Sequence, residues 1–233
     1  GGVAAIAGVA PSFVLREAHA AGEVATRDLA TPVTNAKRWG MLIDITKLTD
    51  GGRAIVEACK REHGWDNAPN SAPEQKTHWV RVVKVTDKLT KNSFELPVMC
   101  QHCEKPPCVD VCPTGASMKR ADGIVQVNMH VCIGCRYCMM ACPYKARSFV
   151  HEPLIDQKPT TPRGMGCVES CNLCVRRVDN GQLPACVEAA PEALTFGDLN
   201  DPNSTISQKL KAMGGKQIRA DLNLNTGVRY YGI

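Results

Sequence analysis

The sequence contains few of the large side chains that fill most protein interiors. Aromatic residues make up only 5% of its 233 residues, although the apolar fraction of 44% is ordinary. A glycine-rich phosphate-binding loop, a nucleophile–base constellation and a domain of molybdopterin-binding size are also missing. The chain therefore has little with which to run substrate chemistry itself. Its one domain, or two small domains, need something other than aromatic side chains in the interior.

A long hydrophobic run is missing as well, but residues 1–15 are mostly small and apolar and carry no charge. Together with Ala18-His19-Ala20 they resemble the apolar region and the cleavage site of an export signal. We therefore predict an export-signal-like segment over residues 1–22, of the twin-arginine type that moves folded proteins, and an extracytoplasmic location. A buried helix and a segment retained as a membrane anchor remain alternatives, although about 15 apolar residues are short for a full span.

The rest of the sequence predicts short elements joined by loops. Strands are expected where β-branched and apolar residues cluster, and helices where apolar residues recur with helical spacing. The expected strands are 41–45, 79–85, 123–127 and 193–196, and the expected helices are 53–61 and 204–213. Residues 23–38 are predicted to form a polar linker, 64–76 a loop and 201–233 a C-terminal extension.

Cysteine, in contrast, is abundant and arranged in repeats. The 13 cysteines are too many for ordinary packing and too few for a dense disulfide scaffold. Two cysteine runs are intact, and a third ends at Ala190-Pro191, where a fourth cysteine and its proline would stand. The intact runs are Cys100-x2-Cys103-x4-Cys108-x3-Cys112-Pro113 and Cys132-x2-Cys135-x2-Cys138-x3-Cys142-Pro143, and the shortened run contains Cys171, Cys174 and Cys186.

A fourth, more degraded copy is recognised at the front of the chain from Cys59 alone. Counting back from Cys59 with the spacing of the second intact run places Thr49, Gly52 and Ile55 at the three missing cysteine positions. The segment 51–55 then aligns with 134–138 of the intact run, which supports this register.

The intact spacing is typical of cubane iron–sulfur clusters. Three closely spaced thiolates surround one cluster, and the fourth cysteine, followed by proline, reaches the neighbouring cluster. Two such runs therefore bind two [4Fe–4S] clusters reciprocally. The predicted ligands are Cys100, Cys103, Cys108 and Cys142 for cluster A, and Cys132, Cys135, Cys138 and Cys112 for cluster B.

The same reciprocity, applied to the degraded front copy and the last copy, predicts one further cluster. Cluster C would be held by Cys171, Cys174, Cys186 and Cys59, all of which are present. Its partner cluster would need four cysteines at positions that hold other residues, namely Thr49, Gly52, Ile55 and Ala190. Random decay is not expected to remove one complete ligand set and spare the other, so we predict three [4Fe–4S] clusters.

The predicted fold class is α+β, with two bacterial-ferredoxin-like units in tandem and interleaved. Residues 95–155 form the half with two clusters, and residues 39–94 and 156–200 together form the half with one. The net charge of +5 fits this prediction. Each oxidised cubane with four thiolates contributes roughly two negative charges, so three of them bring the protein near neutrality. The basic excess is therefore weak support for nucleic-acid binding.

Three plainer interpretations of the cysteines compete with this one. Structural zinc would use two separated C-x2-C pairs per ion and leave the Cys-Pro feature unused. Disulfides suit an exported protein, but the thiols of C-x2-C-x2-C lie too close along the chain for several unstrained bridges. For Cys59 taken alone, a core cysteine is the usual interpretation. Stapling by zinc or disulfides would make the protein an interaction module.

Several residues near the clusters have alternative roles. Cys167 could replace Cys171, but a buried or capped thiol is favoured because the Cys171/Cys174 spacing matches the intact runs. His102 and His130 could relay protons, although histidines that donate hydrogen bonds at the surface or behind the ligands are commoner. Flanking cations could tune cluster potentials or simply be solvated; they are Lys105, Lys119, Arg120, Arg136 and Lys145.

The cysteine runs, with Val98-Met99-Cys100-Gln101-His102-Cys103 and 133–138, resemble the four-cluster ferredoxin-type iron–sulfur subunits of respiratory membrane complexes. The likeness covers residues 40–200. The segments 162–174 and 196–202 are similar to a narrower group, the exported DsrO-like subunit of the membrane complex associated with dissimilatory sulfite reduction. The missing ligand set departs from the four-cluster pattern.

This resemblance implies an electron-transfer subunit without a catalytic site of its own. The expected partners are a quinone-interacting integral membrane subunit of the polysulfide-reductase type, a multihaem cytochrome c and further complex subunits, at the periplasmic face of the membrane. An alternative is the iron–sulfur subunit of a molybdopterin oxidoreductase such as a polysulfide, nitrate or tetrathionate reductase.

Overall fold

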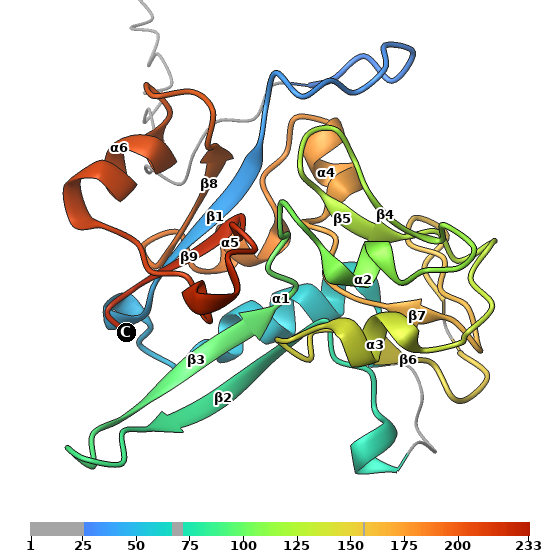
Figure 1. Ribbon diagram of the computed structural model, residues 1–233, viewed down its shortest axis with the longest axis horizontal. Helices are drawn as coiled ribbons and strands as arrows, with labels where there is room; N and C mark the ends of the chain where they lie inside the picture. The colour runs from blue at the N-terminus through green and yellow to red at the C-terminus, as the bar shows by residue number, and fades with distance from the viewer. Residues whose placement is uncertain (1–25, 67–71, 156) are drawn as a thin grey trace, which may run out of the picture.

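A computed structural model describes residues 26–66, 72–155 and 157–233 of the chain (Figure 1). The predicted export segment, residues 1–22, lies outside the described residues, as do residues 23–25 of the predicted linker. The rest of that linker, from residue 26 on, contacts α4 (Val175–Asp179), where Arg27 forms an ion pair with Asp179.

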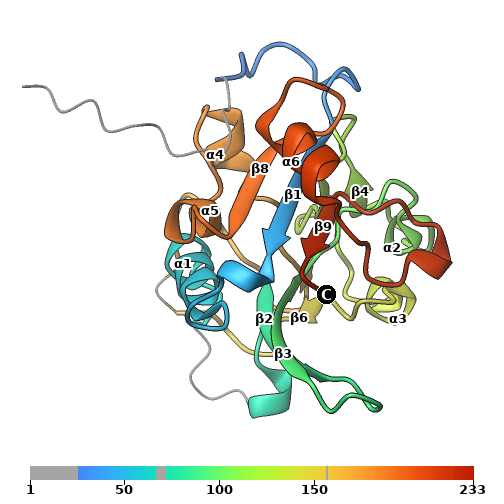
Figure 2. The ribbon, with the colours of Figure 1, turned by 90° about the vertical axis from the view of Figure 1, so that its left-hand side faces the viewer.

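A three-stranded sheet in the order β8-β1-β9 forms one side of the molecule. The central strand β1 (Trp39–Asp44) is buried along its whole length, and it pairs antiparallel with β8 (Leu194–Asp198) and parallel with β9 (Val228–Tyr231). The rings of Trp39 and Phe196 stack with centroids 5.2 Å apart. Helix α6 (Thr205–Met213) covers one face of this sheet (Figure 2).

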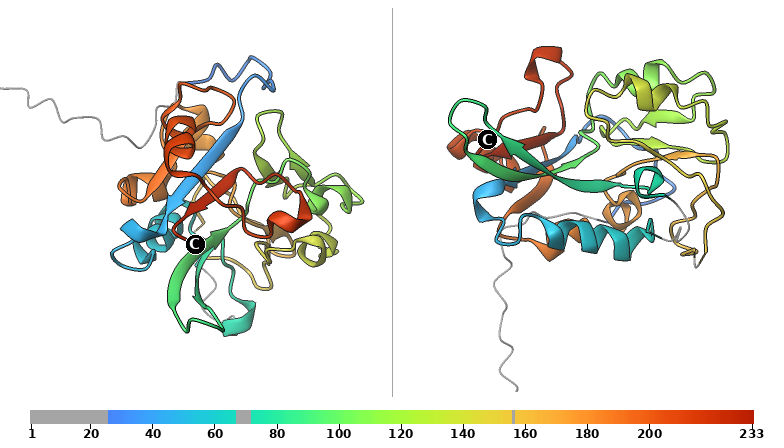
Figure 3. Two further views of the ribbon diagram at one scale, coloured as in Figure 1. Left: turned by 60° about the vertical axis from the view of Figure 1, so that its left-hand side comes forward. Right: turned by 90° about the horizontal axis from the view of Figure 1, so that it is seen from below.

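The remaining strands form three two-stranded sheets. The longest is the hairpin of β2 (Val80–Thr86) and β3 (Ser93–Met99), which runs beside α1 (Arg53–His63) (Figure 3). The two smaller sheets carry the cysteine loops. They are β4 (Ser117–Lys119) with β5 (Val125–Val127), and β6 (Ser148–Phe149) with β7 (Val168–Glu169).

Four of the helices pack in two pairs, one in each half of the molecule. Helix α2 (Pro107–Asp110) packs on α3 (Tyr137–Ala141), and α1 packs on α5 (Ala185–Ala189) (Figure 1). Single 3-10 turns lie at Ile45–Lys47, Pro73–Gln75 and Ala220–Leu222. The first cysteine copy thus packs on the last, and the two intact copies pack on each other.

The mixture of helices and strands confirms the α+β class, and each of the six expected elements has a counterpart. The strand expected over 123–127 begins only at Val125, because Gly123 has a φ of 88° in a turn closed by the Arg120 carbonyl. The stretch 201–233 does more than extend the chain, since its strand β9 pairs with β1 in the central sheet. The described part of the loop 64–76 contains the Pro73–Gln75 turn.

Candidate metal centres

The four cysteines predicted to hold cluster A lie around one small cavity. All four thiols are buried, and Arg147 and Tyr144 line the same cavity. Cys108 lies in α2, while Cys142 directly follows α3. The crossing expected from the sequence, in which one run completes the ligand set of the other, is therefore present in the placement of the thiols. We call Cys100, Cys103, Cys108 and Cys142 quartet A.

The four cysteines predicted for cluster B line a second cavity, and this one lies at the surface. Cys138 is buried, but Cys135 is exposed and the other two are half-buried. Cys112 enters the set from the end of α2, the mirror of the crossing that brings Cys142 to quartet A. We call Cys112, Cys132, Cys135 and Cys138 quartet B.

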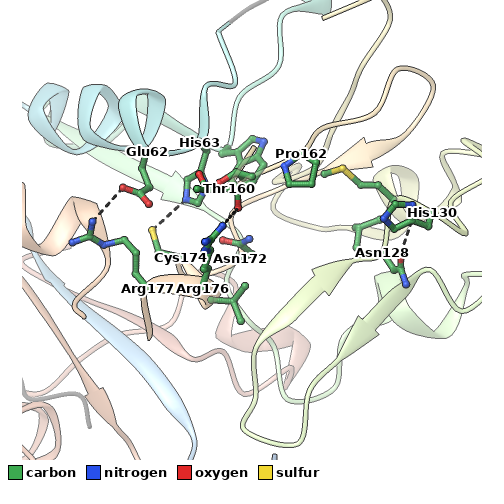
Figure 4. Close-up of a pocket in the computed structure, with 15 residues that line it drawn as sticks. Glu62, His63, Asn128, His130, Thr160, Pro162, Asn172, Cys174, Arg176 and Arg177 are labelled. Carbon is green, nitrogen blue, oxygen red and sulfur yellow. Dashed lines mark hydrogen bonds and ion pairs between the residues drawn. The ribbon is translucent and has the colours of Figure 1, made fainter. Parts of the chain in front are cut away.

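The third set brings Cys59 together with cysteines more than a hundred residues away in sequence. Burial raises the pKa of the Cys171 thiol, and the neighbouring Cys59, Cys174 and Cys186 raise it further. These four buried cysteines form quartet C. Helix α1 carries Cys59 to the site, and the helix and the loop after it supply two hydrogen-bond partners. Trp65 Nε1 donates to Cys59 Sγ at 3.2 Å, and His63 Nε2 lies 3.2 Å from Cys174 Sγ (Figure 4).

The fourth set of positions, Thr49, Gly52, Ile55 and Ala190, carries no thiol, and two of its side chains pack in the core. Ile55 is fully buried, and Ala190 packs against the same hydrophobic core. A Cβ atom added to Gly52 would lie 2.7 Å from Cγ of Pro97, in strand β3. The hairpin therefore occupies space that a side chain at position 52 would need.

The backbone repeats in all four copies, including the degraded one. The third residue of each C-x-x-C turn has positive φ: 44° at His102, 69° at Gly134 and 53° at Leu173. At the corresponding position of the front copy, Gly51 has a φ of 67°. Non-glycine residues seldom adopt this conformation, so its recurrence at matched positions supports the register assigned to the front copy.

The spacing of the thiols suits a polynuclear group better than a single ion. Across the described ranges, no three His, Cys, Asp or Glu side chains come close enough to hold one metal ion. A structural zinc ion would draw four thiolates to about 2.3 Å from one centre. Quartets A and B instead line cavities, as a cubane at their centre requires.

Unpaired polar groups in the two cavities also fit iron–sulfur clusters. Arg147 and Tyr144 in the first cavity, and Ser117 in the second, have buried donor atoms with no partner among the described residues. Cluster sulfides would accept such hydrogen bonds. The sequence alone singled out only other cations near the clusters and missed Arg147. An arginine just before a short strand, five residues after a cysteine, gives no signal in a single sequence.

The histidines and Cys167 have different surroundings from one another. His102 is buried, not at the surface: its Nδ1 accepts a hydrogen bond from the Val125 N–H at 3.0 Å, and burial lowers its pKa to about 3. His130 is exposed. Cys167 lies beside quartet B, where its buried thiol donates to the Met129 carbonyl at 3.4 Å. Its place away from quartet C agrees with the favoured interpretation of a capped thiol.

The flanking cations differ in their surroundings, and of them Arg136 lines the quartet B cavity. Arg120 bridges Asp122 and Asp179, and the Arg136 guanidinium lies 4.0 Å from the centre of the Phe149 ring. The others are solvent-facing lysines; Lys119 donates to the Glu104 carbonyl, and Lys105 and Lys145 are exposed.

A cavity of about 260 Å³ with both charged and apolar lining residues lies beside quartet C, on the side of Cys174. Figure 4 shows His63 and Cys174 on one side of it and Asn128 and His130 on the other. Glu62 and Arg177 form an ion pair at its edge. Quartet C therefore borders a cavity that charged side chains flank, whereas exposed apolar side chains surround quartet B.

Cysteine quartets in ferredoxin-type loops, two of them reciprocal, are typical of iron–sulfur proteins of the cubane class. The 4Fe–4S dicluster domain family matches residues 91–199, which contain every predicted ligand except Cys59. The sequence is 39% identical to the Hdr-like menaquinol oxidoreductase iron-sulfur subunit 1 of Archaeoglobus fulgidus, over 94% of this chain and 95% of the relative. The protein belongs to that family of iron–sulfur subunits and carries [4Fe–4S] clusters.

Other relatives come from several kinds of oxidoreductase. Protein NrfC of Escherichia coli is 41% identical over 76% of this chain and 73% of its own length. The B component of the polysulfide reductase of Wolinella succinogenes is 39% identical over 75% of this chain and 84% of its own length. The predicted class of subunit is thus confirmed, while the narrower likeness to the DsrO-like group stays a prediction.

Proposed function

We propose that this chain holds three [4Fe–4S] clusters on quartets A, B and C and relays single electrons through them. The two ends of the relay are a quinone-interacting integral membrane subunit and a multihaem cytochrome c, in a sulfur-metabolism complex of the DsrO-containing type. A bound [4Fe–4S] cluster accepts and returns one electron with little structural change. The protein's part is to hold the cysteines, exclude water from quartets A and C, and leave quartet B accessible.

The observation that carries this proposal is the grouping of the cysteines. Twelve of the 13 fall into three complete quartets, and the four positions of the remaining set all lack a thiol. An interaction module stapled by zinc or disulfides would have no need for reciprocal quartets around cavities. The relatives named as oxidoreductase subunits support a redox function.

The surface around quartet B supports the membrane-subunit partner. Large apolar side chains are exposed within two residues of its cysteines, and we call them the apolar rim. Exposed apolar patches of this kind mark contacts with other proteins or with membranes. Among the described residues, no helix is long and apolar enough to cross a bilayer. Because of their exposure we assign the side chains of the rim to the contact with a partner subunit; the rim comprises Val111, Val131, Ile133, Tyr137 and Met140.

A second candidate function is that of the iron–sulfur subunit of a molybdopterin oxidoreductase. Its support is the similarity to the B components of polysulfide reductase and of the tetrathionate reductase of Salmonella typhimurium, the latter 37% identical over 74% of this chain. The absent fourth ligand set favours the first candidate, because a wire to a catalytic subunit would lose one of its centres. Haem c in the purified complex would support the cytochrome partner, and molybdenum would support the alternative.

The relay itself is tested in the complex purified with its membrane subunit under anaerobic conditions. Addition of a menaquinol analogue is expected to produce the EPR signals of reduced [4Fe–4S] clusters, or their return to the oxidised state with a quinone. A protein that can be reduced by dithionite but exchanges no electrons with either form of the quinone, directly or through the other subunits, would contradict the proposed function. A protein without EPR signals after dithionite would favour the stapled module.

A further inference from the structure

Arg147 is a buried cation whose counter-charge comes from the cysteine quartets. It is 5% exposed, and no carboxylate within the described ranges pairs with it. Arg163, the other arginine buried to this degree in the described chain, forms an ion pair with Glu169. An unpaired buried guanidinium would be strongly destabilising, so negative charge must reach Arg147 from another source.

The neighbours of Arg147 belong to two different quartets. Its Nη2 donates a hydrogen bond to Cys108 Sγ of quartet A at 3.2 Å, and its side chain lines the quartet A cavity. Cys138 of quartet B also lies near the Arg147 guanidinium. Helix α2, which carries Cys108, packs on α3, which carries Cys138, so the bond to Cys108 places the guanidinium where the two sites meet. The guanidinium thus lies between the two sites.

Two of its donor atoms are still free to reach further. Nε and Nη1 are buried and have no partner in the part of the chain that the structure describes. The planar fork of a guanidinium presents donors in several directions at once, which a lysine ammonium cannot do from one position. The same side chain can therefore donate to sulfur atoms on both sides.

We propose that Arg147 is a positioning residue that sets the reduction potentials of clusters A and B together, as a shared counter-cation. This inference rests on the proposed function, because it assumes clusters on both quartets. One electron enters each cluster on reduction and no bond of the protein is made or broken. A fixed positive charge in a low-dielectric interior stabilises the more negative, reduced state, and hydrogen bonds to sulfur act in the same direction. Arg147 accordingly raises both potentials.

The other half of the molecule offers an internal comparison. Counting five residues on from Ala190, as Arg147 follows Cys142, leads to Thr195. This threonine is buried, and its hydroxyl accepts a hydrogen bond from Lys209 Nζ at 2.9 Å. The half with two complete quartets therefore has an arginine in the matched position, and the half with one has a neutral side chain.

The test is an EPR-monitored redox titration of the full chain with its clusters loaded, with dithionite as reductant. Arg147→Met keeps the aliphatic bulk and removes the charge and the donors. It is expected to lower the midpoint potentials of both A and B and to leave that of C unchanged. Lys145→Met, which removes an exposed charge two residues away, is the matched control and is expected to move none of them, since solvent screens that charge.

A second variant keeps the proposal testable if Arg147→Met fails to retain its clusters. Arg147→Lys retains the positive charge, but a lysine ammonium cannot donate to sulfur atoms of both sites from one position. The variant is therefore expected to keep the midpoint potential of one cluster near the wild-type value and to lower that of the other. Unchanged potentials of A and B in either loaded variant, or an equal shift of all three clusters, would overturn the proposal. Because dithionite replaces the natural partners, this result does not depend on whether quinol drives the relay.

Discussion

The two halves of the molecule have the same arrangement of paired helices and differ in the number of cysteine quartets between them. In one half, α2 packs on α3 and two cysteine quartets line cavities; in the other, α1 packs on α5 and only quartet C is present. At the missing quartet, Ile55 is buried and Pro97 of the hairpin meets Gly52. The pair of α1 and α5, which carries Cys59 and Cys186 of quartet C, persists without a second cluster because apolar packing supports it at the missing site. A cluster site therefore consists of thiols, free space and a counter-charge, and the missing site of the second half lacks all four thiols.

Removing one thiol from the half with a single quartet gives the largest expected effect. Cys59→Ala should abolish cluster C, because three cysteines remain and water or a neighbouring side chain is a poor substitute. Iron is expected to fall by about four atoms per chain, with loss of one EPR signal.

Cys167→Ala is the matched control for this change, since both thiols are buried and only Cys59 lies in a quartet. It should retain all the iron. The ligand assignment would be wrong if Cys167→Ala lost a cluster and Cys59→Ala did not.

Isoleucine has different roles in the two halves: Ile55 packs in the core, and Ile133 lies at the surface. Ile55→Ala should lower the free energy of unfolding by about 2–5 kcal/mol, because it leaves a cavity where the missing cluster would lie. Ile133 in the apolar rim is 68% exposed, so Ile133→Ala should change stability by less than about 0.5 kcal/mol and instead weaken binding of the membrane subunit. Chemical denaturation and co-purification measure the two effects.

Equal destabilisation by both isoleucine substitutions would mean that packing has not replaced the lost cluster at Ile55. Undiminished co-purification of the Ile133→Ala protein, and of a protein with Met140→Glu in the same rim, would assign the docking surface elsewhere.

Restoring the missing thiols is expected to have the smallest effect on metal content. The variant Thr49→Cys/Gly52→Cys/Ile55→Cys/Ala190→Cys should still contain three clusters, since Pro97 crowds position 52 and position 55 lies in the packed core. Iron and acid-labile sulfide measured after anaerobic reconstitution provide the comparison with the wild type. A gain of about four iron atoms would show that the thiols alone were lacking.

The grouping of the cysteines could be predicted from the sequence because cysteine spacing is a local property. The run of Cys132, Cys135 and Cys138 specifies its turn by itself, and reciprocity between copies then places Cys59 beside Cys171. Arg147 could not be found in this way. Its role depends on which thiols surround it in space, and nothing in the sequence around residue 147 states that.

Parts of the fold could not be derived from local sequence either. The strands β1 and β8 could be expected from their own residues, but the pairing of β1 with β9 joins segments almost two hundred residues apart. The contact of Pro97 with Gly52 likewise depends on how the hairpin lies against α1. Long-range contacts of this kind are set by the assembled core and not by the propensities of each segment.

Whether the protein holds three clusters, and not two or four, is decided by its content of iron and acid-labile sulfide. The measurement is made on full-length protein purified without oxygen, with chain concentration from amino-acid analysis. Three cubanes predict about twelve iron and about twelve sulfide per chain. About sixteen of each would mean that a fourth cluster is held without the missing thiols, and about eight would mean that quartet C is empty; either result would contradict the assignment of three clusters.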